Sequence, residues 1–330
     1  MNAVRLVHER LDELYRHQLP VDESRVQSFY RSGRGYYPPG DAGDERDQFG
    51  ICVVTTDGET YQAGDVAIPF ALQSISKVFA YALALADRGR DHVLTRVGVE
   101  PSGDAFYSIT FDERSNRPHN PMVNAGALVT SSCVRGATAA EQCERILQAL
   151  RRCAGSDRLD VDPATFEAEL ATADRNRATA YLMRSRGMIT GDVEETLALY
   201  LRQCSVEVTC VELAMMAATL ANGCVHPLTG ERALPRGHVR DVLSVMYTCG
   251  MYDFAGQWAY EVGVPAKSGV SGGILAVVPG KMGIGVYSPG LDAYGNSVRG
   301  IRVCHEISKH LGLHVFATEA EDVVLEPGTS

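Results

Sequence analysis

The sequence predicts an α+β fold in which an antiparallel sheet, built from segments near both ends of the chain, is covered by helices and carries a large helical insertion. Two observations indicate this architecture. Apolar, strand-like runs joined by turn signals occur before residue 64 and after residue 272, whereas helical periodicity dominates between residues 74 and 249. With 45% hydrophobic and 22% charged residues, the 330-residue chain has the composition of a globular protein with a sizeable core.

The first elements that the sequence predicts are an amphipathic helix at 3–17 and a loop at 31–48, where Gly, Pro and Asp are frequent. Strands follow at 49–56 and 59–63. Asp57-Gly58 joins these two strands, and Asp-Gly between apolar runs is a strong signal for a hairpin.

The middle of the chain predicts a series of helices from the spacing of its apolar residues. The clearest patterns lie at 74–88, 122–135, 139–152, 163–186, 192–203, 209–222 and 236–248. Gly223 and Gly250 stand where glycine commonly ends a helix.

The tail returns to strands at 273–279 and 281–288, separated by Pro279-Gly280, and a last helix is expected at about 297–311. The simplest packing pairs the early hairpin with these late strands in one antiparallel sheet. The N- and C-terminal helices would then cover the sheet, and the helical middle would form an insertion beside it.

Charge and composition exclude several functional classes. Against 41 acidic residues the chain has 31 Lys and Arg, a formal charge of −10, which argues against nucleic acid as a partner. No apolar run approaches the roughly 18 residues of a membrane span, and the N-terminal residues lack the apolar stretch of a secretory signal. We therefore expect a cytoplasmic protein without a membrane anchor. Its nine cysteines include no Cys-x-x-Cys pair and are expected to be free thiols.

No metal and no cofactor is expected. His305-Glu306 resembles the start of a zinc-binding helix, but His310 follows His305 by five residues rather than four and falls on another face. His310 and His314 share a face without an evident third ligand. Gly280-Lys281 lacks the preceding glycine of a phosphate-binding loop, and Gly283 and Gly285 lack the third glycine of a dinucleotide loop.

The candidate nucleophile is Ser74, with Lys77 as its base. An extended segment after Pro69 meets a helix near residue 74, so Ser74 would lie among the unpaired N–H groups of a helix N-terminus. Lys77 is three residues later and shares that helix face. Only about one free lysine in 2,500 is neutral at pH 7, so burial or a second cation must lower the pKa of Lys77. On its own the pair is more often a helix cap followed by a surface lysine.

A second motif supports the catalytic interpretation. In enzymes built on Ser-x-x-Lys, a Lys-Ser/Thr-Gly strand lies across the site from the nucleophile, and Lys267-Ser268-Gly269 occurs here in the expected order. Gly269 would allow close approach of a substrate to the backbone. The alternative is a glycine-rich turn that enters a strand.

Several segments together resemble the bacterial and animal glutaminase family, whose members hydrolyse L-glutamine to L-glutamate and ammonia. They are PFALQSISKVF, EPSGDAF, RPHNPMVNAGAL, ADRNRATAYLM, CGMYDFAGQWAY and VGVPAKSGVSGGILAVVPGKMGIGVYSP. The resemblance implies a serine-dependent fold like that of β-lactamases and penicillin-binding proteins. It also implies one catalytic domain over 1–330, with a helical subregion at about 115–250, and a homo-oligomer, often a homotetramer.

The resemblance also assigns roles residue by residue. Ser74 matches the nucleophile, Lys77 the base, Tyr252 a proton-transfer group, Lys267 a cation of the site and Val270 an oxyanion donor. The substrate contacts that it implies are Ser74, Asn124, Glu169, Asn176, Tyr200, Tyr252 and Val270.

Glu169 and Asn176 also share an independent argument, because they lie seven residues apart within the helix predicted at 163–186 and would face one way. Glu169 suits the α-ammonium group of an amino acid. The alternatives are a solvated face for this pair, and packing or helix-start roles for Asn124, Tyr200 and Tyr252.

The sequence departs from the family's pattern at two places, and two alternative functions stay open. Tyr107 replaces the Asn that the family usually has, and the loop at 31–48 is less apolar than in the family. The first rival is a penicillin-recognising serine hydrolase, which shares the fold and both motifs. The second is a catalytically silent binding or scaffold protein.

Overall fold

The computed structural model describes residues 3–19, 47–103, 108–109, 111–112, 114–235 and 237–317. Most of the loop predicted at 31–48, and Tyr107, lie outside these residues. The main sheet has five strands in the order β2-β1-β7-β6-β5, with every neighbouring pair antiparallel. These strands are β1 (Gly50–Thr55), β2 (Thr60–Gly64), β5 (Ala266–Ser268), β6 (Gly273–Val278) and β7 (Met282–Tyr287).

The sheet joins the two ends of the chain as the sequence predicts. β1 pairs with β7 along its whole length, with Val53 opposite Ile284. Gly58 and Gly280 turn the two hairpins with φ values of +94° and +71°, a region that glycine enters without steric cost. Both predicted hairpins are confirmed.

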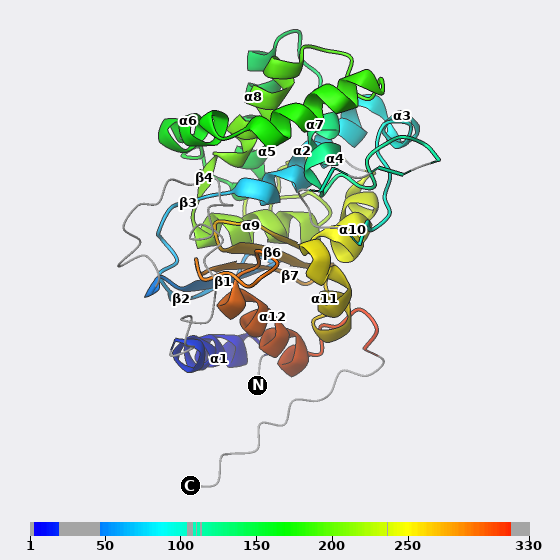
Figure 1. Cartoon of the computed structure of the whole chain (residues 1–330). Coiled ribbons are helices and arrows are strands. Elements are labelled where there is room, and N and C mark those ends of the chain that lie inside the picture. Colours follow the sequence, from blue (N-terminus) through cyan, green and yellow to red (C-terminus); the bar gives the residue numbers. More distant parts are fainter. Residues whose placement is uncertain are drawn as a thin grey trace, which may run out of the picture.

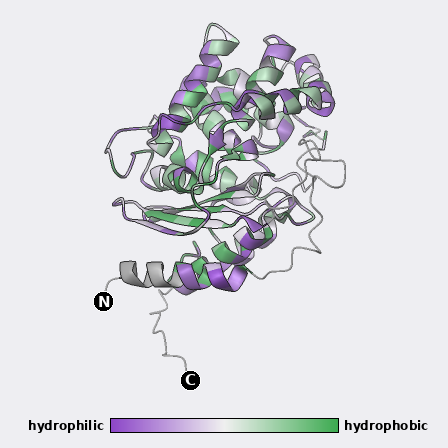
Figure 2. Cartoon of the chain, turned by 90° about the vertical axis from the view of Figure 1, so that its left-hand side faces the viewer, coloured by the Kyte–Doolittle hydropathy of each residue, from purple (hydrophilic) through white to green (hydrophobic). Residues whose placement is uncertain are grey.

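Helices cover both faces of the sheet (Figure 1). On one face lie α1 (Ala3–Gln18), α11 (Ala255–Glu261) and α12 (Val298–Leu311), which bury Trp258 and Val303 against the sheet. On the other face lies α9 (Cys210–Ala221). The strands between these layers are predominantly hydrophobic (Figure 2), because a sheet covered on both faces has no solvated side.

Helix α9 lies close to the sheet because small residues meet glycines there. Cys210, Ala214 and Ala218 recur every four residues and so share one helix face. A Cβ atom on Gly283 of β7 would lie 2.1 Å from the backbone nitrogen of Ala218, and one on Gly285 would lie 2.7 Å from that of Ala214. Only glycine therefore fits at these two positions.

The middle of the chain forms a layer of helices beyond α9 (Figure 1). The further helices are α2 (Ser76–Arg88), α3 (Arg90–Leu94), α4 (Asn124–Cys133), α5 (Ala139–Ala154), α6 (Pro163–Ala171), α7 (Asp174–Ser185), α8 (Val193–Cys204) and α10 (Val239–Cys249). Between the strands of the main sheet, the chain thus makes a large helical excursion. The predicted α+β class is confirmed.

The single helix predicted at 163–186 is wrong, since the chain breaks between α6 and α7. The N–H groups of Thr172 and Ala173 bond to carbonyls three residues back, those of Glu169 and Leu170, which tightens and ends the helix. The Thr172 hydroxyl donates to the Ala168 carbonyl, 3.0 Å away. Ala173 is buried and α7 starts again at Asp174.

The two glycines expected at helix ends are required for different structural reasons. Gly223 has φ +66° and follows α9 in the left-handed conformation, as predicted. Gly250 ends α10 with an ordinary φ of −76°. A Cβ atom there would lie 1.7 Å from the carbonyl oxygen of Ala266, so Gly250 is required by the closeness of β5 rather than by a left-handed turn.

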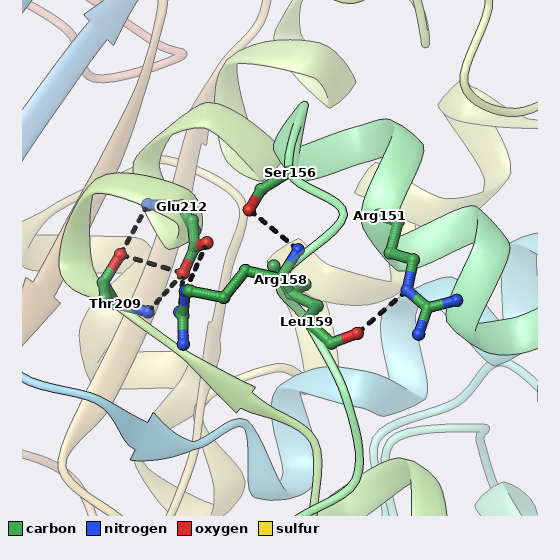
Figure 3. A network of polar contacts seen from close by, with 6 residues as sticks. All are labelled: Arg151, Ser156, Arg158, Leu159, Thr209 and Glu212. Carbon is green, nitrogen blue, oxygen red and sulfur yellow. Dashed lines mark hydrogen bonds and ion pairs between the residues drawn. The ribbon is translucent and has the colours of Figure 1, made fainter.

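The N-terminus of α9 is fixed by a network of polar contacts (Figure 3). Thr209 and Glu212 form a capping box, and the Arg158 guanidinium pairs with the Glu212 carboxylate. Burial acts to raise the pKa of Glu212, but the hydrogen bonds from Arg158 and Thr209 lower it overall. This network fixes the chain at the short strand β4 (Glu207–Val208), which pairs with β3 (Phe70–Ala71).

Two smaller findings concern the cysteines and the helix lengths. All nine cysteines are free thiols, as expected, and eight of them are buried. Within the described ranges, no helix is both long and apolar enough to cross a membrane.

The contact between α9 and β7 gives a stability prediction. Gly283→Ala should lower the free energy of unfolding by about 1–3 kcal/mol, because its methyl group meets backbone atoms that cannot move aside. Gly191→Ala is the control, since Gly191 has open space around its Cβ position, and it should change the value by less than about 0.5 kcal/mol. Chemical denaturation measures both, and equal effects would contradict the packing account.

Candidate active site

Ser74 lies in a single 3₁₀ turn, η3 (Gln73–Ile75), between the end of β3 and the start of α2. Ser74 is therefore not the first residue of the helix, as the sequence predicts, but lies in the turn before it. The Leu72 N–H donates to the Val206 carbonyl at 2.8 Å, so the chain that carries β4 also fixes the approach to Ser74. Gln73 has φ +51°, a conformation that is uncommon for any residue with a side chain. Ser74 is 6% exposed.

Lys77, in the first turn of α2, is completely buried. Its Nζ atom donates to the Met122 carbonyl at 3.1 Å and to Asn124 Oδ1 at 2.7 Å. Burial lowers the pKa of Lys77 to about 8, against a smaller opposing effect of the Cys204 thiol. With a pKa of about 8, roughly one amine in ten is neutral at pH 7, compared with one in 2,500 for an exposed lysine.

Three helices bring polar side chains to this amine. Asn124, the first residue of α4, accepts from Lys77 and donates through Nδ2 to Asn176 Oδ1 of α7 at 3.0 Å. Tyr200 of α8 donates from its hydroxyl to Asn124 Oδ1 at 3.3 Å, and its ring centroid lies 5.9 Å from Lys77 Nζ. Asn124, Asn176 and Tyr200 therefore form one buried polar cluster around Lys77.

Glu169 is a buried carboxylate on α6 that points toward the Ser74 turn. Its Oε1 atom accepts from Gln73 Nε2 at 2.9 Å. Burial raises the pKa of Glu169 to about 7, and the hydrogen bond from Gln73 opposes that rise. Asn176 and Glu169 belong to different helices, so the two-turn spacing argument is wrong, although both side chains are buried in the same region.

Tyr252 and Lys267 close the site from the side of the sheet. Tyr252 starts a second 3₁₀ turn, η4 (Tyr252–Phe254), with φ +54°, and its side chain hydrogen-bonds with that of Ser74. Its hydroxyl donates to the Ser268 carbonyl at 3.0 Å, which also accepts from Lys267 Nζ at 2.6 Å. Burial raises the pKa of Tyr252, and the bond with Ser74 opposes this rise.

Lys267 is the second fully buried lysine, on β5. Its Nζ atom lies 4.2 Å from the centroid of the Tyr252 ring. Burial, with the nearby Lys77 amine, holds the pKa of Lys267 well below its usual value. Only four lysines occur in the whole chain, Lys77, Lys267, Lys281 and Lys309, so half of them are buried in this one site.

Val270 follows β5 in a turn that lies against the Ser74 segment. A Cβ atom on Gly269 would lie 3.1 Å from the Leu72 carbonyl oxygen and 3.5 Å from Gln73 Cβ. Glycine at 269 thus lets the two backbones approach. The structure therefore gathers all nine residues named from the sequence, from Ser74 to Val270, into one connected and largely buried region.

Two further buried residues of this region were missed by the sequence analysis. Gln73 contacts Glu169, and Cys204 lies 3.8 Å from Ser76 Oγ and hydrogen-bonds with Tyr200. No sequence signal marks Gln73, because glutamine is not a residue type that favours a positive φ. Cys204 lies one residue beyond the helix predicted at 192–203, so no sequence signal marks it either.

An open cleft of about 340 Å³ borders the site. Tyr252, Met122 and Val123 line it, together with apolar residues of α11 such as Ala255 and Ala259. Met122 contributes its carbonyl to Lys77, so the cleft and the amine lie on two sides of one segment. Within the described part of the chain, no group of three His, Cys, Asp or Glu side chains could hold a metal ion.

Comparison with known sequences identifies close relatives. The family model described as Glutaminase matches residues 36–316, a range that contains every residue of the site. The glutaminase of Trichormus variabilis is 60% identical over 270 residues, which cover 82% of this chain and 80% of that protein. The glutaminase of Clostridium tetani is 43% identical over 304 residues, or 89% and 99% of the two chains.

Solved structures agree with the sequence relatives. A probable glutaminase from Bacillus subtilis matches with a TM-score of 0.85 and 37% identity, over 94% of this chain and 98% of that one. A structure of Mglu in its glutamate form matches with a TM-score of 0.85 and 41% identity, over 95% and 70% of the two chains.

The contact between Lys77 and Asn124 gives a prediction that needs no activity assay. Asn124→Asp places a carboxylate beside the amine, which favours the charged form and should raise the pKa of Lys77 from about 8 toward its ordinary value. NMR titration of the lysine side-chain carbons measures this, and four lysines keep the spectrum simple.

Lys281 and Lys309 serve as internal controls in the wild type and the variant, because both are exposed and neither belongs to the buried site. A wild-type Lys77 whose pKa is that of an ordinary exposed lysine would contradict the lowered pKa that its burial implies.

Proposed function

The chain belongs to the glutaminase family and hydrolyses the side-chain amide of L-glutamine, and we propose that Ser74 attacks this amide and carries the γ-glutamyl group as an ester. One observation supports the proposal most strongly. The Ser74 side chain hydrogen-bonds with Tyr252, and the first turn of the helix that follows the Ser74 turn holds Lys77, a buried amine with a pKa of about 8. A hydroxyl needs such a base before it becomes a nucleophile at neutral pH.

In the first step the neutral Lys77 amine takes the Ser74 proton as Oγ attacks the amide carbon. Burial provides the neutral amine, and the Met122 carbonyl and Asn124 Oδ1 hold it in place. The negative charge that develops on the amide oxygen would be bound by the backbone N–H groups of Ser74 and Val270. The close approach that Gly269 allows between these two segments supports this assignment.

Ammonia then leaves with a proton passed from Lys77 through Tyr252. The Tyr252 hydroxyl suits this relay because it contacts both the Ser74 side chain and the Ser268 carbonyl. Lys267 lies beside the Tyr252 ring and, when protonated, would add positive charge to the site. Water enters by the reverse proton route and hydrolyses the ester to L-glutamate.

Substrate recognition divides between a carboxylate and a set of donors. Glu169, when ionised, would bind the α-ammonium group of glutamine. Asn124, Asn176 and Tyr200 present amide and hydroxyl donors that suit the α-carboxylate. Because a buried carboxylate without a partner is costly, this pocket should discriminate strongly against amides that lack the α-amine.

The penicillin-recognising alternative is not favoured, because the family model, the sequence relatives and the solved structures above are glutaminases. The sequence motifs that suggested it belong to a fold that both groups share.

We further propose that the whole chain acts as one catalytic domain and assembles as a cytoplasmic homotetramer. Nine free thiols suit a reducing compartment. Light scattering would measure the mass of the assembly, and a mass of one chain of 35.7 kDa would refute the tetramer.

Replacement of the nucleophile gives the most direct prediction for this mechanism. Ser74→Ala should lower kcat for glutamine by at least about a thousandfold, because no other hydroxyl replaces Oγ. Ser185→Ala, at the surface end of α7, is the control and should leave kcat unchanged. Both variants should first show the unfolding curve of the wild type. Ammonia release then measures their activity, and wild-type activity in Ser74→Ala would refute the role of Ser74 as the nucleophile.

The pH dependence follows from the two shifted groups. Catalysis requires neutral Lys77, with a pKa of about 8, and ionised Glu169, with a pKa of about 7. Both groups lose their active form as pH falls, so log kcat/KM for glutamine should fall with a slope near one between these values and near two below both. A profile that is flat from pH 6 to pH 9 would contradict both assignments.

A further inference from the structure

Gln73, like Tyr252, has a constrained backbone geometry. It is buried, its φ of +51° is unusual for a residue with a Cβ atom, and it precedes Ser74 directly. Its carbonyl accepts from the Ser76 hydroxyl at 2.8 Å, and Gly269 lies against its Cβ atom. Strain of this kind persists only when surrounding contacts enforce it, and it concentrates at functional sites.

From this strained backbone the Gln73 side chain reaches Glu169. Nε2 donates to Oε1 of Glu169, 2.9 Å away and 96 residues later in the sequence. An amide N–H bonded to one oxygen fixes the plane of the carboxylate and leaves its remaining lone pairs for a ligand. A bond of this type is charge-assisted, and it is stronger with the ionised carboxylate than with the neutral acid.

We infer that Gln73 is a positioning residue for substrate selectivity: its side-chain amide orients the Glu169 carboxylate toward the α-ammonium group of the substrate and stabilises its charged form. The inference rests on the proposed role of Glu169 in binding that group. The strained backbone beside Ser74 then serves substrate recognition, because a relaxed backbone at residue 73 would direct the side chain elsewhere.

The surroundings of Glu169 contain few groups that could replace Gln73. The Cys204 thiol of α8 and, beyond it, the Lys77 amine of α2 face the same interior. The Arg202 guanidinium of α8 instead stacks over the Phe166 ring, 4.8 Å from its centroid. Burial raises the pKa of Glu169 to about 7, and the Gln73 bond is the influence that acts against it.

The test compares Gln73→Met with wild type on two substrates, glutamine and its analogue without the α-amine, glutaric acid monoamide. Methionine keeps the length of the side chain and removes the donor. A hydrogen bond to a charged group corresponds to a change of about tenfold or more in affinity. KM for glutamine should therefore rise about tenfold with kcat within a few-fold of wild type, whereas kcat/KM for the analogue should stay nearly constant.

The pH profile provides the readout that a purely structural role would not move. Loss of the donor raises the pKa of Glu169 further, so the acid limb of kcat/KM for glutamine should shift to higher pH. The limb for the analogue, which has no ammonium group to bind, should not shift. Equal losses for both substrates at every pH would overturn the inference.

Two more variants keep the test decisive. Gln73→Asn suits the positive φ better and shortens the amide out of reach of Glu169, so it serves if the Met variant does not fold. It should show the same selective loss. Glu169→Gln tests the role of Glu169 apart from that of Gln73. If this variant keeps wild-type discrimination between the substrates, the proposed role of Glu169 is wrong. If it loses discrimination while Gln73→Met and Gln73→Asn keep it, only the inference about Gln73 fails.

Discussion

Everything in the site depends on the burial of the Lys77 amine. A lysine without solvent favours its neutral form, and it can then act as a base near neutral pH. The same burial requires partners for the amine, which Met122 and Asn124 supply. The polar cluster of Asn124, Asn176 and Tyr200 thus surrounds the amine, and under the proposed mechanism it would also present donors to the substrate.

The rest of the fold holds two strained turns on either side of Ser74. Gln73 and Tyr252 both have positive φ, which costs of order 1–3 kcal/mol each unless the scaffold enforces it. The enforcement is visible in the pairing of β3 with β4, in the capped start of α9 shown in Figure 3, and in the contact of Gly250 with β5. Stability is therefore concentrated in α9 and the sheet, while the strain lies at the residues that touch the reacting groups.

Local signals were enough to predict the elements but not their exact junctions. The Asp57-Gly58 and Pro279-Gly280 hairpins followed from turn chemistry within a few residues. Gly250 is required by a distant segment, and the break at Thr172 is made by short-range bonds that the spacing of apolar residues does not show. The positive φ of Gln73 has no marker in the local sequence. The site residues came mainly from family resemblance. Spacing put Ser74 and Lys77 on one helix, whereas Ser74 lies in the turn before it, and it put Glu169 and Asn176 on one helix although they lie on two.

The central claim is that a buried lysine activates Ser74 toward the amide of glutamine. Rapid-quench mass spectrometry of the protein mixed with glutamine, followed by peptide mapping, measures the formation of a γ-glutamyl ester directly. The account predicts an adduct on the peptide that contains Ser74, forming at a rate that rises with pH and levels off above about 8, where Lys77 is neutral. An adduct on another residue, or a rate of formation that does not change with pH across this range, would contradict the activation of Ser74 by Lys77.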